Sequence, residues 1–353
     1  MTGHSPSDVP ALGEVMLRFD PGEGRIRTAI ADTKVELSAL GFGAAGIGNL
    51  YRSVTDGQAA AAVDAAWNAG IRYFDTAPHY GLGLSERRLG EALRDRPRDQ
   101  FILSSKVGRL LVPNQHPQGM DDQGFAVPDG LRRRWDFSRD GVLRSIEETL
   151  KRTGLDRLDI VYVHDPDDHW QQAADQAMPT LAELRDQGVI GAIGAGMNQS
   201  AMLARFLRET AADVVMLAGR YTLLDQTALD DVLPAALERG KSVVAVGVFN
   251  SGLLSKEQPS AGMKYDYQDA PPRLVRKAAA IAEICEQHGT TLPAAAMAFA
   301  FTHPAVVNVT LGMGSPHHVE RNAALFAHSV PSRLWADLRA ARLLRDDVPI
   351  PPA

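Results

Sequence analysis

The hydrophobic pattern alternates between two kinds of segment from residue 35 onward. Short runs rich in Val, Ile, Leu and Phe predict buried strands, and longer segments with apolar residues every three or four positions predict amphipathic helices. The predicted strands are 35–42, 71–74, 101–105, 158–163, 190–194, 213–217, 242–247 and 306–311. The predicted helices are 57–69, 85–94, 139–153, 176–187, 199–210, 227–239, 272–288 and 316–328, with one more at 331–344.

These segments form eight β/α units in order, with no linker dividing them. Such repetition implies an α/β fold with a parallel sheet, and eight units favour a single closed (β/α)8 TIM barrel over an open sheet. Segments 108–136 and 250–271 follow predicted strands, so we expect long loops on the C-terminal face, where barrel active sites lie. We expect the barrel to span 35–345, between an N-terminal extension (1–34) and a C-terminal tail (346–353).

Composition and charge narrow the possible partners. The 353 residues carry 37 Lys and Arg against 43 Asp and Glu, a net charge of −6, and Arg132–Arg134 is the one tight basic cluster, so we expect no nucleic-acid partner. No apolar run approaches the ~20 residues that span a bilayer. Met1–Pro10 lacks the features of a secretory signal, which favours a cytoplasmic protein without a membrane partner. A single cysteine, Cys285, excludes an internal disulfide.

A glycine motif near the start of the barrel admits two readings. Gly41-Phe42-Gly43-Ala44-Ala45-Gly46 matches the dinucleotide-binding pattern G-x-G-x-x-G. In that motif the third glycine already lies in a helix, whereas residues 47–55 separate these glycines from the next predicted helix. A glycine-rich barrel loop therefore explains the match better than a Rossmann fold.

Polar side chains follow three successive predicted strands. Asp75 and Tyr80 follow the second, Lys106 the third and His164 the fourth, and neighbouring strand ends in a barrel bring such residues together. A lysine ammonium favours a nearby phenolate, a carboxylate holds the lysine, and an imidazole orients a substrate oxygen. Each residue alone has a structural alternative, such as a turn cap or a core histidine. Together they suit proton transfer in carbonyl and alcohol redox chemistry.

These motifs resemble the aldo-keto reductase superfamily over about residues 35–330. Lys106 and His164 fall where that family's lysine and histidine fall. Its second-strand signature is similar to Phe74-Asp75-Thr76-Ala77-Pro78-His79-Tyr80-Gly81, followed by Ser85-Glu86. The resemblance implies that Tyr80 is the catalytic acid and base, that Asp75 and Lys106 tune it, and that His164 orients the substrate. It also implies a nicotinamide dinucleotide bound without a Rossmann motif.

Segments 194–199, 218–226 and 248–254 are similar to sugar-oxidising members of that family. The resemblance implies an NAD(P)-dependent oxidoreductase that converts an aldose of the L-fucose, D-arabinose or L-galactose type into its aldonolactone at C1. Oxidation of pyridoxal, whose hemiacetal presents the same chemistry, and general aldehyde or ketone reduction remain alternatives. A non-catalytic barrel that binds the dinucleotide is less consistent with the intact catalytic set.

A metal-dependent barrel hydrolase is the alternative from a different class. His164, Asp165, Asp167, Asp168 and His169 are close in sequence. Barrel metal sites draw ligands from several strand ends, whereas these residues share one loop, so we expect no metal.

The resemblance also implies binding residues. The cofactor set comprises Gly43, Asn198, Phe249, Asn250, Ser251, Gly252, Leu254, Gly312, Gly314, Ser315, His318 and Asn322. The small-molecule substrate is expected to contact His79, Tyr51 and Arg220. NADP-dependent relatives place lysine and arginine where this chain has Gly312 and His318, and only Arg321 lies nearby, so we expect NAD to be preferred over NADP.

Overall fold

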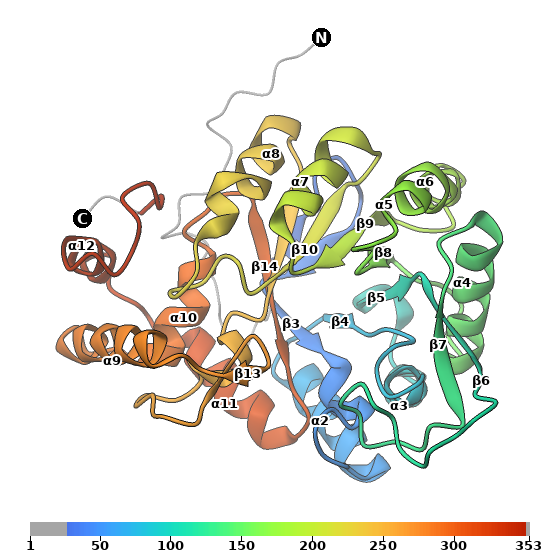
Figure 1. Cartoon of the computed structure of the whole chain (residues 1–353), viewed down its shortest axis with the longest axis horizontal. Helices are drawn as coiled ribbons and strands as arrows, with labels where there is room; N and C mark the ends of the chain where they lie inside the picture. The colour runs from blue at the N-terminus through green and yellow to red at the C-terminus, as the bar shows by residue number, and fades with distance from the viewer. Residues whose placement is uncertain (1–26, 351–353) are drawn as a thin grey trace.

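Eight parallel strands close into a barrel in the computed structural model, which describes residues 27–350 (Figure 1). They follow one another around the barrel in chain order, and β14 pairs with β3 to close it. The strands are β3 (Leu40–Gly43), β4 (Tyr73–Asp75), β5 (Ile102–Val107), β8 (Ile160–His164), β9 (Ala192–Met197), β10 (Val214–Ala218), β11 (Ser242–Val246) and β14 (Val306–Gly312). The predicted (β/α)8 barrel is therefore confirmed.

Helices surround the barrel (Figure 1). They cover the outer face of its strands, which are apolar and buried on both faces. They are α2 (Asp56–Asn68), α3 (Leu84–Leu93), α4 (Arg139–Thr153), α6 (Met178–Asp186), α7 (Ser200–Glu209), α8 (Val232–Arg239), α10 (Leu292–Ala300) and α11 (Pro316–Ala327). Short helical turns occupy Ala44–Gly48, Arg98–Gln100, Thr227–Asp230 and Asn250–Gly252. None of the helices within residues 27–350 is long and apolar enough to cross a membrane.

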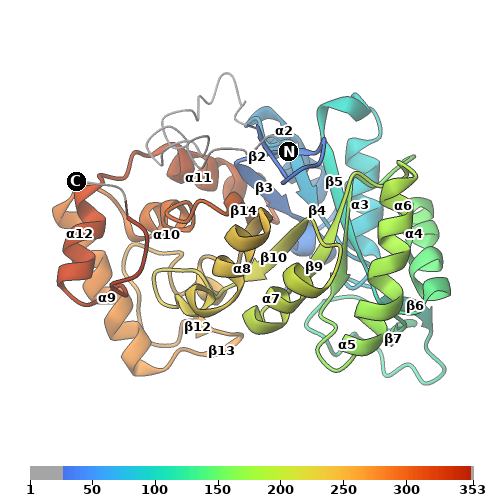
Figure 2. The same cartoon turned by 90° about the horizontal axis from the view of Figure 1, so that it is seen from above.

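The helical layer departs from the prediction chiefly at α10 and before α6. Helix α10 was not predicted, and all nine of its residues are buried. The predicted helix 272–288 is α9 (Pro272–Gln287), which packs on α10 and on α12 (Arg333–Ala340) at one side of the molecule (Figures 1 and 2). The helix predicted at 176–187 begins earlier, with α5 (Trp170–Gln172) and a π-helical turn at Ala173–Ala177.

A hairpin covers the N-terminal end of the barrel. The predicted strand 35–42 is divided into β2 (Glu36–Ser38) and β3, and β2 pairs with β1 (Arg27–Ala29), a strand that the sequence pattern did not predict. The hairpin side chains Ile30, Val35 and Leu37 are buried with residues of the barrel interior. Figure 2 shows this hairpin at the opposite end from the ribbons described next. Residues 1–26 of the expected extension lie outside the described residues.

Both segments predicted as long loops contain a two-stranded ribbon. In segment 108–136, β6 (Arg109–Pro113) pairs antiparallel with β7 (Leu131–Trp135). In segment 250–271, β12 (Lys264–Tyr265) pairs with β13 (Gln268–Asp269). The ribbons hold these segments in defined positions beside the C-terminal strand ends (Figure 2).

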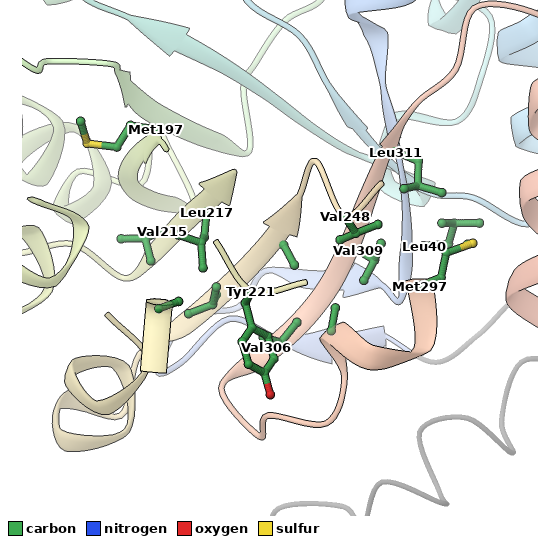
Figure 3. Close-up of a cluster of buried hydrophobic side chains, with 14 of the residues drawn as sticks. Leu40, Met197, Val215, Leu217, Tyr221, Val248, Met297, Val306, Val309 and Leu311 are labelled. Atoms are coloured by element: carbon green, nitrogen blue, oxygen red, sulfur yellow. The ribbon is translucent and has the colours of Figure 1, made fainter. Parts of the chain in front are cut away.

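The main hydrophobic core fills the space between the barrel and its helices. Leu40 of β3 and Val309 of β14 lie beside Met297 of α10 (Figure 3). Val348, in the segment expected as a tail, is also buried in this core. The core therefore extends from the barrel to the last residues that the structure describes.

Candidate active site

A cavity of about 470 Å³ opens at the C-terminal strand ends. Its volume falls within the roughly 300–1,000 Å³ of small-molecule sites. Residues at or near the strand ends line it: Lys106, His164, Asp165, Gly196, Met197, Met216, Ala218 and Val246. Loops contribute Ala45, Leu50, Tyr51, His79, Tyr80, Gln123, Phe125 and Tyr267. The lining thus combines apolar side chains with polar and aromatic ones.

A buried ion pair lies at one wall. The Lys106 Nζ donates hydrogen bonds to Asp75 Oδ1 (2.8 Å), to Asp75 Oδ2 (2.6 Å) and to the Thr76 carbonyl (3.0 Å). Burial lowers the pKa of Lys106, but the charges of Asp75 and Tyr80 and the hydrogen bonds to both outweigh it, so the pKa is raised. The lysine is therefore a fixed ammonium group.

A chain of hydroxyl groups inside the barrel positions Asp75. The hydroxyls of Tyr162 and Tyr73 are 3.2 Å apart, and Tyr73 contacts Ser104 Oγ at 3.0 Å. Ser104 Oγ donates to Asp75 Oδ1 at 2.7 Å. Burial raises the pKa of both tyrosines, which keeps them neutral hydrogen-bonding groups. Asp75 thus accepts hydrogen bonds from both Ser104 and Lys106.

Tyr80 faces both the ammonium group and His164. The Lys106 Nζ lies 4.8 Å from the centre of the Tyr80 ring, and the His164 ring meets Tyr80 edge-on at 5.9 Å. Burial raises the pKa of Tyr80 to about 12, although Lys106 acts to lower it. The expected influence of Lys106 is present, but burial is the larger effect. The phenol is therefore protonated at neutral pH.

Two neutral histidines lie beside Tyr80. The rings of His79 and His164 are 5.6 Å apart. Burial lowers the pKa of His164 far below its usual value, and the charges of Arg109 and Lys106 add to this effect. Burial likewise lowers the pKa of His79 to about 2. A neutral imidazole at His164 can hydrogen-bond a substrate oxygen without adding charge.

The expected substrate residues divide into two groups. His79 and Tyr51 line the cavity. Arg220 is not among the lining residues, because its guanidinium pairs with Asp266 (3.1 Å) and Asp225 (3.7 Å). Arg220 therefore braces a neighbouring segment.

Sequence reasoning missed Arg109 and Tyr267, and it did not assign Asp165 to the catalytic or substrate residues. Arg109 forms an ion pair with Asp165, which lies 3.5 Å from His164 Nε2. Tyr267 reaches the cavity from the turn between β12 and β13. Their signal in the sequence was weak, since only Asp165 lies within two residues of the end of a predicted strand.

The possible metal cluster does not assemble. Within residues 27–350, no three His, Cys, Asp or Glu side chains gather as a metal site. Asp167 instead accepts a hydrogen bond from Gln199. The His169 ring packs against Trp135 and Phe137, each at 5.4 Å.

Several predicted cofactor residues gather where β14 meets α11. Ser315 Oγ accepts a hydrogen bond from the His318 backbone N–H (3.3 Å), and the Gly314 N–H donates to His318 Nδ1 (3.4 Å). Gly312 is exposed, with open space beside its Cα, and Asn322 is buried in α11. This edge presents backbone groups at the start of a helix.

The remaining cofactor candidates lie in more varied surroundings. Ser251 and Asn198 are exposed, Gly252 and Phe249 are partly exposed, and Asn250 is buried. Leu254 is fully buried in the core, so its side chain does not face a cofactor. At Gly43 a Cβ would lie 3.0 Å from the Leu311 carbonyl oxygen, so close packing against β14 accounts for this glycine.

A family model described as the aldo/keto reductase family matches residues 39–342, and the barrel with this site is therefore an oxidoreductase that acts on a CH–OH group. The chain belongs to this family. The resemblance inferred from the sequence is confirmed.

Several relatives align over most of the chain. A D-threo-aldose 1-dehydrogenase from a Pseudomonas species is 48% identical over 90% of this chain and 97% of its own length. A pyridoxal 4-dehydrogenase from Microbacterium luteolum is 36% identical over 90% of this chain and 98% of its own. A solved glycerol dehydrogenase from Gluconobacter oxydans superposes with a TM-score of 0.72, 22% identity and coverage of 93% of this chain and 97% of its own. That structure supports the fold alone.

Aldo-keto reductases use nicotinamide cofactors, and the residues present fit such a group. The first turn of α11 offers N–H groups suited to phosphate oxygens. Gly312 leaves open space beside them. Asn250 Oδ1 is buried without a hydrogen-bond partner among the described residues, so it is available as an acceptor. Gly312, Ser315 and Asn250 would hold parts of the cofactor.

Proposed function

We propose that the chain oxidises the C1 hydroxyl of a cyclic aldose to an aldonolactone. The observation that carries this proposal is the arrangement of Tyr80 and His164, which meet edge-on in one cavity with the Lys106 ammonium beside the phenol ring. Two hydrogen-bonding groups can thus contact one substrate oxygen, and one of them is built to exchange a proton. The 48% identity with a D-threo-aldose 1-dehydrogenase supports an aldose as the substrate class.

The protein's own groups handle the proton and the position of the sugar. His164, which is neutral, hydrogen-bonds O1 and orients C1. Tyr80 in its phenolate form removes the O1 proton, and Lys106 stabilises that form. The C1–H bond breaks as the C1=O bond forms, so C1 loses a hydride and O1 loses its proton to Tyr80. A bound nicotinamide dinucleotide supplies the hydride acceptor.

Pyridoxal is the second candidate substrate. The aromatic side chains Tyr51, Phe125 and Tyr267 line the cavity and suit a flat ring. The pyridoxal 4-dehydrogenase at 36% identity supports this alternative. Its hemiacetal would meet Tyr80 and His164 in the same way.

A turnover assay tests the proposal. The purified chain is incubated with NAD⁺ or NADP⁺ and L-fucose, D-arabinose, L-galactose or pyridoxal, and both reduced cofactor and lactone are measured. We expect one or more aldoses to exceed pyridoxal in kcat/KM. The Tyr80→Phe variant should lose about 10²-fold to 10⁴-fold or more in kcat while still binding the cofactor, as measured by fluorescence titration. Near-normal turnover in Tyr80→Phe, or no aldose oxidation by the wild type, would refute the proposal.

We also propose that NAD is preferred over NADP. A 2′-phosphate needs cationic partners. Burial lowers the pKa of His318, so this side chain is neutral, and Arg52, whose charge adds to the lowering, is a nearby cation at this edge. Arg321 donates to the Ser255 carbonyl instead of remaining free at the surface. We expect a higher kcat/KM with NAD⁺, and an equal or higher value with NADP⁺ would contradict this preference.

A further inference from the structure

Three residues whose side chains line the cavity have backbone φ angles in the left-handed region. The φ angles of Tyr51, Asp165 and Tyr267 are +62°, +42° and +65°. Residues with a Cβ rarely adopt positive φ, and for bulky side chains the conformation carries a cost in free energy. Such residues persist where the surrounding structure fixes them, often at ligand sites. Three of the ten described non-glycine residues with positive φ line this one cavity, which indicates that side-chain placement there outweighs local strain.

The turn that carries Tyr267 is the clearest case. β12 and β13 are joined by Asp266 and Tyr267 alone, and Asp266 also has a positive φ of +45°. Glycine and asparagine are the usual residues at such positions. The Tyr267 side chain is 71% exposed, so burial does not offset the strain. Its position at the cavity offers a reason for the tyrosine.

Other residues hold this turn in place. The Tyr267 backbone N–H donates to Ser251 Oγ at 3.0 Å. Arg220 forms its ion pair with Asp266 at 3.1 Å. These contacts fix the backbone of the turn and so hold the exposed Tyr267 side chain in one position. A side chain that recognises a ligand needs such a fixed position.

Asp165 faces the same space from the end of β8. Its backbone N–H donates to the Gly196 carbonyl at 3.0 Å, and Arg109 of β6 holds its carboxylate. The carboxylate is partly exposed and lines the cavity.

We propose that Asp165 and Tyr267 form a subsite that recognises the hydroxyl groups of a polyhydroxylated substrate. The carboxylate accepts charge-assisted hydrogen bonds from substrate hydroxyls. The Tyr267 ring packs on the C–H face of the substrate, and its phenol hydrogen-bonds a further hydroxyl. An apolar aldehyde gains nothing from either group. The inference deepens the proposed aldose oxidation and rests on it for the identity of the natural substrate.

The test compares two aldehydes of equal chain length, glyceraldehyde and propanal, in cofactor-dependent reduction. The readout is the ratio of their kcat/KM values, since damage to Tyr80 or His164 would slow both substrates alike. The wild type should prefer glyceraldehyde. Asp165→Asn should lower the ratio about tenfold or more, and Tyr267→Phe should lower it severalfold, because hydrogen bonds to charged groups contribute more than neutral ones.

The matched control variants change residues two positions away from Asp165 and from Tyr267. Asp167→Asn removes a charge from the same loop, and Tyr265→Phe removes a hydroxyl that contacts Asp225 at 3.3 Å. Neither Asp167 nor Tyr265 lines the cavity. Both controls should keep the wild-type ratio.

Each outcome decides the inference. A wild type without preference for glyceraldehyde, or Asp165→Asn and Tyr267→Phe variants that keep the ratio, would overturn it. If Asp165→Asn fails to fold because Arg109 loses its partner, Tyr267→Phe decides alone. If the ratio falls as expected but no aldose is oxidised, the subsite is supported and the proposed aldose oxidation fails.

Discussion

At the scale of single residues, Tyr80 is subject to opposed influences. Burial raises its pKa, whereas the Lys106 ammonium lowers it, and the balance lies at about 12. Oxidation needs the phenolate, so only a small fraction of the protein is in the reactive form at neutral pH. Because Lys106 lowers the pKa of Tyr80, it increases the fraction of the protein that carries the phenolate.

We expect the rate of oxidation to rise with pH. Because the pKa of Tyr80 lies above the working range, log(kcat/KM) for oxidation should increase from pH 7 to pH 10. Lys106→Met should move the profile to higher pH and lower kcat by about 10²-fold. The check is a pH–rate profile for each protein, with thermal melting as the control for folding. A plateau reached below pH 9, or identical profiles, would contradict this role.

The catalytic candidates were predictable because each follows a strand. Asp75, Lys106 and His164 lie at the ends of strands that parallel pairing places side by side. Tyr267 was not predictable, since its position depends on a turn with positive φ and on a ribbon at a distant point of the chain. Contact between Arg220 and the substrate stays a prediction, and the sequence does not reveal the pairing of Arg220 with Asp266.

At the scale of elements, Glu86 joins α3 to its neighbours. Its carboxylate is fully buried and accepts hydrogen bonds from Ser105 of β5 (3.0 Å) and Thr149 of α4 (2.8 Å). Arg152 of α4 forms an ion pair with it. Glu86 belongs to the motif that pointed to the family, yet its role is to pack α3 and α4 onto the barrel beside Tyr80.

Removal of this carboxylate should destabilise the fold. We expect Glu86→Ala to lower the free energy of unfolding by about 3–5 kcal/mol, because Arg152 loses the partner of a buried ion pair. Urea unfolding provides the measurement. Glu147→Ala is the control, since Glu147 pairs with Lys151 on an exposed surface and its loss should change stability little. Equal stability of the two variants would argue against this role.

Element prediction failed where the usual pattern is absent. Helix α10 is apolar on every side, so its sequence has no amphipathic period to detect. The eight barrel strands were predictable because double-sided burial makes them short apolar runs. Strand β7 escaped notice because Arg132, Arg133 and Arg134 suggest a solvated loop.

At the scale of the whole molecule, buried histidines make the free energy of unfolding depend on pH. His79 and His164 at the site and His303 before β14 all have lowered pKa values, caused first by burial. The pKa of His303 is about 4, whereas an unfolded histidine titrates near 6.5. Below pH 6.5 the unfolded chain therefore binds more protons than the folded chain.

The fold should consequently lose stability in acid. We expect the free energy of unfolding to fall as pH drops from about 6.5 toward 4, by up to about 1.4 kcal/mol per pH unit for each such histidine. His303→Asn keeps an acceptor for the Ala305 N–H and should make the decline shallower. Urea unfolding between pH 7.5 and pH 4.5 measures both slopes. Indistinguishable slopes would exclude His303 as a contributor.

The β1–β2 hairpin closes the N-terminal end of the barrel. Ile30, Val35 and Leu37 are buried there, so reactants enter and leave at the C-terminal strand ends. Both reactants of the proposed oxidation would therefore share the C-terminal face of the barrel as their route of entry and exit.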